Sequence, residues 1–72
     1  MEILYDAHAL ERMQERHVRE EHIRYVLLSG HFVRKSHDGR REAWEARILT
    51  RRIRVVVEWL QGDMAYVHSV WV

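Results

Sequence analysis

The chain has 72 residues, a formal net charge of +1 and no cysteine. This length predicts a single domain over residues 1–72 with a small core, and the lack of cysteine excludes disulfides and thiolate metal cages. The near-neutral charge argues against a strongly basic nucleic-acid-binding protein, although all but one of the 12 basic residues are arginine. Arginine binds phosphate with a planar fork, but a genome rich in arginine codons would give the same excess.

The N-terminal residues and the apolar runs indicate where the chain resides. Residues 1–10 lack a basic segment followed by a long apolar one, so we expect no signal peptide. The longest apolar runs, residues 25–28 and 55–57, are far shorter than the roughly 20 residues that cross a membrane. Since a chain without cysteine also suits a reducing compartment, we expect a cytoplasmic protein without membrane contact.

Two helices are predicted in the N-terminal half. The first covers residues 7–17 and has Asp6 as its N-cap. The second covers residues 20–29 and ends before Gly30, although Arg19 stands where a serine, threonine or aspartate cap is expected. The apolar positions of the two helices are Ala9, Leu10, Met13 and Val18, followed by Ile23, Val26 and Leu27.

After Gly30 the apolar period changes from 3.6 to 2, which predicts strands. These strands are expected over residues 31–36, 42–50, 52–60 and 64–72, with residues 3–5 as an optional short strand. The Asp38-Gly39 pair predicts a hairpin turn between the first two. The predicted fold is therefore α+β, with two N-terminal helices packed on one face of a three- to four-stranded antiparallel meander sheet.

Alternation along residues 52–60 separates a core face from a polar face of this sheet. The expected core side chains are Ile53, Val55 and Val57, with Trp44 and Ile48 as partners. The expected residues of the polar face are Arg47, Arg54 and Glu58, with His68 or Ser69 from the last strand.

His8, Arg12 and Arg16 recur every four residues, so they share one face of the first predicted helix. Like charges at this spacing repel by roughly 0.2–0.5 kcal/mol, which Glu11 and Glu15 partly relieve. An imidazole beside two guanidinium groups suits a phosphate, so this face is a candidate anion site. The alternative is an ordinary solvated helix face.

Four segments together resemble a small bacterial family of unknown function: HALERMQER from residue 8, VLLSG from residue 26, IRVVV from residue 53 and VHSVW from residue 67. The first helix of that family reads HAxxRMxxR, and the resemblance spans nearly the whole chain. The family is distantly similar to the RelE and BrnT group of small toxins, which are metal-independent ribonucleases paired with antitoxins. Two positions depart from its pattern, since Ser69 replaces a threonine and His68 an apolar residue.

The resemblance implies a metal-independent endoribonuclease or RNA-binding domain that needs no cofactor. In such a reaction a base removes the 2′-hydroxyl proton, an acid protonates the leaving 5′-oxygen, and arginines stabilise the charged transition state. The catalytic candidates are His8, Glu11, Arg12 and Arg54. The phosphate-binding candidates are Arg12, Arg16 and Arg54.

Several of these residue types have alternative roles. Arg54 would form a cross-strand ion pair with Glu45 if the two face one another. The six histidines contain no HxH, HxxxH or HExxH spacing, so we predict no metal site. The aromatic residues that could stack nucleobases are expected mainly in the core; they are Trp44, Trp59, Tyr66 and Trp71.

The expected partners of a toxin are RNA and a cognate antitoxin protein. One alternative is a non-catalytic protein-interaction module that binds a cognate protein through an open strand edge or the arginine-rich helix. Another is an inert domain that self-associates as a homodimer, because a small core without disulfides gains stability from association. The enzyme hypothesis predicts that His8, Arg12 and Arg54 converge on one concave surface. The interaction hypothesis predicts a flat apolar patch around Trp59 or Trp71, with the polar residues dispersed.

Overall fold

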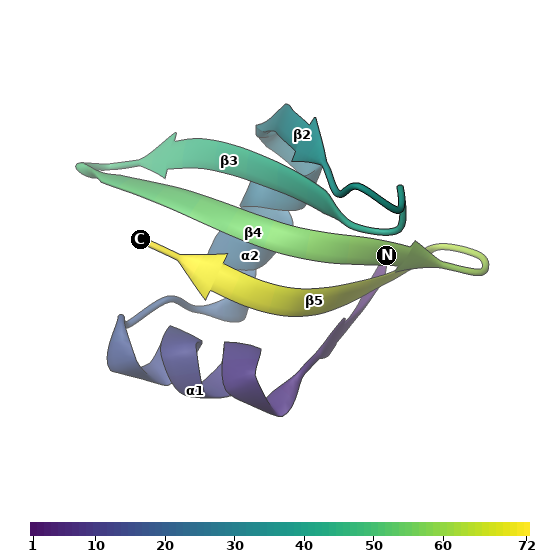
Figure 1. Cartoon of the computed structure of the whole chain (residues 1–72). Coiled ribbons are helices and arrows are strands. Elements are labelled where there is room, and N and C mark those ends of the chain that lie inside the picture. The colour runs from purple at the N-terminus through teal and green to yellow at the C-terminus, as the bar shows by residue number, and fades with distance from the viewer.

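Five strands and two helices make up the fold in a computed structural model that describes all of residues 1–72 (Figure 1). Their order along the chain is β1 (Glu2–Tyr5), α1 (Ala7–Glu15), α2 (Glu20–Ser29), β2 (His31–Lys35), β3 (Glu42–Ile48), β4 (Arg51–Leu60) and β5 (Met64–Trp71). Neither helix has the length and apolar character needed to cross a membrane.

The strands form one mixed sheet in the order β1-β5-β4-β3-β2. Strands β2 to β5 are an antiparallel meander, but β1 pairs with β5 in parallel, with Ile3 opposite Ala65. The predicted three- to four-stranded antiparallel sheet is therefore wrong, because the optional strand at residues 3–5 joins the far end of the chain. A pairing between the first and last strands depends on tertiary packing, which the local apolar pattern does not encode.

Helix α1 is shorter than predicted because its C-terminus is closed by a left-handed residue. Asp6 caps its start, as expected, and accepts the His8 N–H at 3.0 Å. Helical residues end at Glu15, and His17 has φ 54°. The N–H of Val18 then donates to the Met13 carbonyl at 2.8 Å, which is the long bond of a Schellman motif.

Both ends of helix α2 depend on unusual residues. The Arg19 N–H donates to His22 Nδ1 at 3.0 Å, so a histidine of the first turn satisfies the N–H of the N-cap residue, although the Arg19 side chain does not cap the helix. At the other end, the backbone of Gly30 passes close to β3. A Cβ at Gly30 would lie 2.4 Å from the Val26 oxygen and 2.6 Å from the Glu45 oxygen, although its φ of −79° is ordinary. Glycine is therefore required here for space rather than for backbone freedom.

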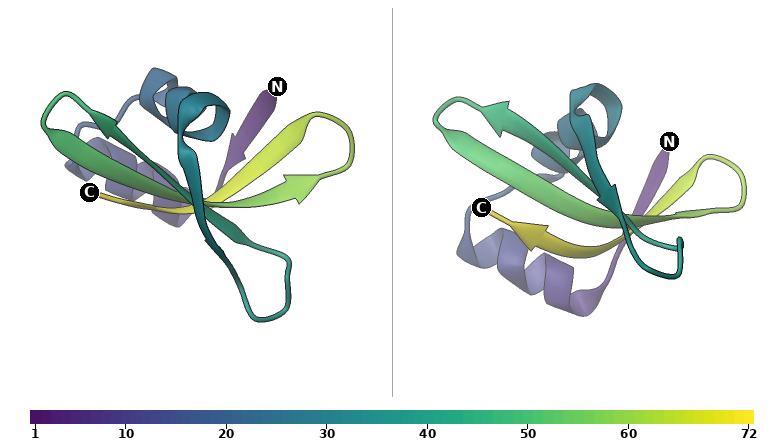
Figure 2. Two further views of the ribbon diagram at one scale, coloured as in Figure 1. Left: turned by 90° about the horizontal axis from the view of Figure 1, so that it is seen from above. Right: turned by 45° about the horizontal axis from the view of Figure 1, so that its top comes forward.

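The core lies between the two helices and one face of the sheet (Figure 2). Ile53, Val55 and Val57 are fully buried there, and Trp44 and Ile48 pack at the core edge, as predicted. The remaining buried members are Ile3, Ala9, Met13, Val18, Ile23, Val26, Leu27, Ala46, Ala65, Val67 and Val70. The other face of the sheet carries no helix, and we call it the open face (Figure 2).

Candidate functional site

The open face carries a cross-strand row of polar and aromatic side chains. Register pairs Trp71 with Arg54, Arg54 with Glu45, and Glu45 with His31, so the row crosses β5, β4, β3 and β2. Directly opposed residues of a sheet share a face and lie close enough to interact. The row therefore presents a guanidinium, a carboxylate, an imidazole and an indole side by side.

Glu45 is the electrostatic centre of this row. Its side chain is only 13% exposed and lies 3.1 Å from Arg54 Nη2. Arg52 Nε and His31 Nε2 each lie 3.9 Å from its other oxygen. The alternative role of Arg54 as a cross-strand ion pair with Glu45 is thus confirmed, and this pair holds the Arg54 guanidinium on the open face.

A hollow lies beside this row because the neighbouring cross-strand row on the open face consists of small side chains. Ser69, Val56 and Ala43 are opposed across β5, β4 and β3 and leave space above the sheet. The resulting groove has a volume of about 780 Å³. The charged residues that line it are Arg34, Lys35, Arg41, Arg52 and Arg54, against Glu42 and Glu45. We call it the basic groove.

One wall of the basic groove is the turn between β2 and β3, which projects away from the helices (Figure 2, left). The predicted Asp38-Gly39 turn is present, with Gly39 at φ 77°. Asp38 Oδ1 accepts from Arg40 N at 3.0 Å and from Ser36 Oγ at 2.7 Å, and these two bonds lower the pKa of Asp38. The Arg41 N–H donates to Ser36 Oγ at 3.0 Å, so the turn fixes the backbone that carries Arg41.

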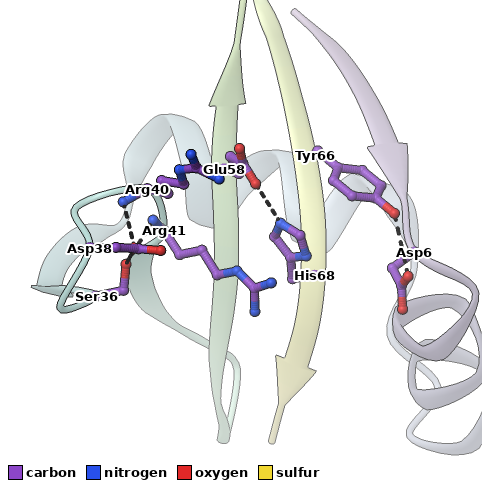
Figure 3. Close-up of polar contacts among 8 residues, drawn as sticks. All are labelled: Asp6, Ser36, Asp38, Arg40, Arg41, Glu58, Tyr66 and His68. Carbon is purple, nitrogen blue, oxygen red and sulfur yellow. Dashed lines mark hydrogen bonds and ion pairs between the residues drawn. The ribbon is translucent and has the colours of Figure 1, made fainter.

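A histidine network lies next to Arg41 on the open face (Figure 3). His68 Nε2 lies 2.9 Å from Glu58 Oε1, and the two side chains are 16% and 30% exposed. The rings of His68 and Tyr66 meet edge to face at 4.7 Å, and the Tyr66 hydroxyl donates to Asp6 Oδ1 at 3.3 Å. Desolvation, followed by the negative charge of Asp6, raises the pKa of Tyr66, while Arg41 opposes this shift.

A bulge in β5 explains why His68 faces this way. Val57 is opposite Val67 and Val56 is opposite Ser69, so His68 is an extra residue in the ladder. Such a residue breaks the alternation of faces and re-aims its side chain. Both His68 and Ser69 therefore belong to the open face, where strict alternation predicted one or the other.

The residues predicted as a stripe on the first helix do not converge on the groove. His8 and Glu11 on α1 and Arg16 at its C-cap are exposed and do not line the groove. Arg12 alone reaches its rim, with the guanidinium carbon 5.3 Å from the centre of the Trp71 ring. Of the predicted site residues, the structure thus brings together Arg12 and Arg54 through Trp71, and their roles in catalysis and phosphate binding stay predictions.

Of the basic residues that line the groove, the sequence analysis named only Arg54 and missed Arg34, Lys35, Arg41 and Arg52. Arg41 follows a turn and belongs to no periodic pattern, so only the turn signal at Asp38-Gly39 could have drawn attention to it. Glu58 and His68 had both been placed on the polar face, and His68 departs from the family pattern. The sequence pattern does not show that the side chains of Glu58 and His68 are in contact. No group of three or more His, Asp or Glu side chains is arranged to hold a metal ion.

The profile of one protein family matches residues 5–72. The chain belongs to the family described as Domain of unknown function (DUF4258). The DUF4258 match begins at the last residue of β1 and includes both helices, the basic groove and the histidine network. Comparison with curated proteins and with solved structures finds no match. The resemblance to a small family of unknown function is confirmed, and its similarity to RelE and BrnT toxins stays a prediction.

Proposed function

We propose that this DUF4258 domain binds RNA in the basic groove and cleaves it without a metal ion, in the manner of a RelE- or BrnT-like toxin. The observation that carries the proposal is the His68–Glu58 pair, which lies beside Arg41 on the same face as the basic groove. This arrangement offers an oriented imidazole, a guanidinium and a surface for the phosphate backbone.

The binding step rests on local rather than net charge. Five cationic residues and two acidic ones line the groove, although the whole chain carries only +1. Arginine and lysine side chains gathered in a hollow attract phosphate groups, and this attraction weakens as salt is added. RNA should therefore bind in the groove with an affinity that falls steeply with ionic strength.

The chemical step assigned to His68 is the attack of an RNA 2′-oxygen on the adjacent phosphorus atom of the same strand. Glu58 accepts a hydrogen bond from Nε2–H, which leaves the lone pair of a neutral imidazole on Nδ1. Nδ1 takes the 2′-hydroxyl proton as the 2′-oxygen bonds to phosphorus, and the bond to the 5′-oxygen breaks. The leaving oxygen takes a proton from water, and His68 returns its proton to the hydroxide. Arg41 stabilises the charge that builds up on the phosphorus oxygens.

The test uses an end-labelled oligoribonucleotide incubated with the protein in the presence of EDTA. We expect products with 2′,3′-cyclic phosphate ends, and about 100-fold slower cleavage or worse for His68→Ala, since acid–base groups contribute at least that much. Arg41→Gln should weaken binding and lower the slope of log K against log salt by about 1. The matched control is Arg16→Gln at the C-cap of α1, which should change neither quantity.

The proposal fails if cleavage persists unchanged in His68→Ala, or if Arg16→Gln weakens binding as much as Arg41→Gln does. The second result would indicate that RNA binds at the predicted residues His8, Arg12 and Arg16 instead of in the basic groove. Glu58→Gln distinguishes orientation from charge in the pair, because glutamine can still accept a hydrogen bond from Nε2.

A non-catalytic, self-associating module is the second candidate function. Exposed apolar side chains on α2 and β2 favour it, since Leu28 is 67% and Phe32 is 47% exposed. Light scattering over a range of protein concentrations tests this candidate, with Phe32→Ser as the variant. Dimers that dissociate in the variant, together with wild-type protein that leaves RNA intact, would favour the module over the toxin. A cognate antitoxin would be sought as a protein that binds the wild type and blocks RNA cleavage.

A further inference from the structure

We propose that the indole of Trp71 is a stacking site for an unpaired nucleobase at the end of the basic groove. This inference rests on the proposed function and narrows its substrate to single-stranded RNA. A tryptophan face stacks on any base, but the base must be free of a pairing partner to reach it.

The three tryptophans differ in the way that the proposal requires. Trp44 and Trp59 both donate their indole N–H to Glu42 Oε1 at 3.0 Å. Trp44 also packs against the core and against Phe32. Trp71, by contrast, lines the groove and is 53% exposed, so a large aromatic surface is left in solvent where burial would be more stable.

The surroundings of Trp71 suit a nucleotide. The Arg12 guanidinium lies 5.3 Å from the ring centre, and such a cation–π contact restricts the indole. Arg54 is directly opposite Trp71 on β4, so a phosphate attached to the stacked nucleotide would meet a guanidinium. This gives Arg12 a positioning role through Trp71.

Trp71 and His68 lie on one strand, three residues apart. At 3.2–3.4 Å per residue this separation is about 10 Å, shortened a little by the bulge. The stacked base and the phosphate at His68 would therefore belong to different parts of one bound strand. Stacking at Trp71 would then set the position of the strand along the groove and thus which phosphate reaches His68.

The experiment measures binding of a fluorescent 2′-O-methyl uridine hexamer by anisotropy, because blocked 2′-oxygens prevent cleavage. We expect Trp71→Leu to weaken binding by roughly 5- to 150-fold, the equivalent of about 1–3 kcal/mol for one stacked base. Trp71→Phe keeps a ring and should lose less than Trp71→Leu. Trp59→Leu is the matched control and should bind like the wild type. The salt dependence of Trp71→Leu should stay unchanged, in contrast to that of Arg41→Gln.

A second set of ligands identifies the base contact. In a set of hexamers, one abasic residue is placed at each position in turn. The wild type should bind one member of this set more weakly than the others, whereas Trp71→Leu should bind all members with equal affinity. A fully paired duplex of the same sequence should bind wild type and Trp71→Leu with the same affinity. Circular dichroism should first show that Trp71→Leu is folded. If this variant then binds the hexamer as the wild type does while Arg41→Gln weakens binding, the stacking site is refuted and RNA binding in the groove is supported. If the wild type binds no hexamer, the proposed function fails and the stacking site with it.

Discussion

Replacing Glu45 with glutamine is expected to weaken the fold and to strengthen anion binding in the basic groove. The Glu45 carboxylate is 13% exposed and lies 3.1 Å from Arg54 and 3.9 Å from both Arg52 and His31. It neutralises cations that would otherwise attract a phosphate. Glutamine has nearly the same shape, so the substitution changes charge with little change in packing.

The two magnitudes follow from the burial of the pair. Breaking an exposed ion pair costs up to about 1 kcal/mol, whereas leaving a buried charge unpaired costs about 3–5 kcal/mol. Arg54 is 38% exposed while Glu45 is mostly buried, so we expect a loss of roughly 1–3 kcal/mol in the free energy of unfolding. Repulsion between Glu45 and a phosphate roughly 6 Å away is about 0.7 kcal/mol in water and about 2.8 kcal/mol at an effective dielectric constant of 20. Removing it should tighten binding by roughly 3- to 100-fold.

Urea unfolding followed by circular dichroism measures the first effect, and anisotropy of the 2′-O-methyl hexamer measures the second. Glu21→Gln on α2 is the matched control, because Glu21 pairs with Arg19 at 3.6 Å but does not line the groove. We expect this control to stay within about 0.5 kcal/mol of the wild type in stability and to bind the hexamer equally. If Glu45→Gln is destabilised yet binds no more tightly, the basic groove is not the anion site and the reasoning is refuted.

Three further predictions concern the backbone and the alkaline pH range. Gly30→Ala should lower the free energy of unfolding by about 3 kcal/mol or more in urea titrations, because its Cβ meets two backbone oxygens. Gly62→Ala, at φ 74° in open space, should cost only about 1 kcal/mol, and equal losses would contradict this argument. His17→Gly should be more stable than His17→Ala by about 1 kcal/mol in thermal unfolding, since residue 17 is left-handed; no difference would contradict it. Burial, followed by the charge of Glu20, raises the pKa of Tyr5 to about 12, so the wild type should lose stability as the pH rises from about 10 to about 12. The loss arises because the unfolded chain releases the Tyr5 proton at a lower pH than the folded chain does. The contribution of Tyr5 to this loss is at most about 2.7 kcal/mol, and it is smaller because the ring is partly exposed. Tyr5→Phe should remove this contribution. Urea unfolding of both proteins across this range checks the sign.

Local patterns predicted the central part of the fold well. The alternation of β4 identified Ile53, Val55 and Val57 as core, and the Asp38-Gly39 pair identified the turn between β2 and β3. These features depend on neighbours in sequence, since a strand has a period of two and a tight turn needs a residue that tolerates positive φ. The cross-strand pair of Glu45 and Arg54 could likewise be named as an alternative, on the condition that the two residues face one another.

Helical spacing gave a weaker guide to the site. It predicted that His8, Arg12 and Arg16 share one face, but α1 ends at Glu15, and a polar face on a helix that covers a core points to solvent rather than to the sheet. Leu10 was expected to pack inward and is instead 50% exposed, because the contact face of α1 is narrow and filled by Ala9 and Met13. Spacing thus identifies the residues that share a face and leaves open what that face meets.

The missed strand pairing and the missed network have one physical origin. The parallel pairing of β1 with β5 continues into Asp6, whose N–H donates to the Val67 carbonyl at 2.9 Å. This bond sets Asp6 beside Tyr66, so that one carboxylate caps α1 through Oδ2 and accepts from Tyr66 through Oδ1. Tyr66 in turn packs against His68, the extra residue of the bulge. A contact between residues about sixty positions apart therefore links the start of α1 to His68, so the pairing of β1 with β5 also brings together the residues around His68.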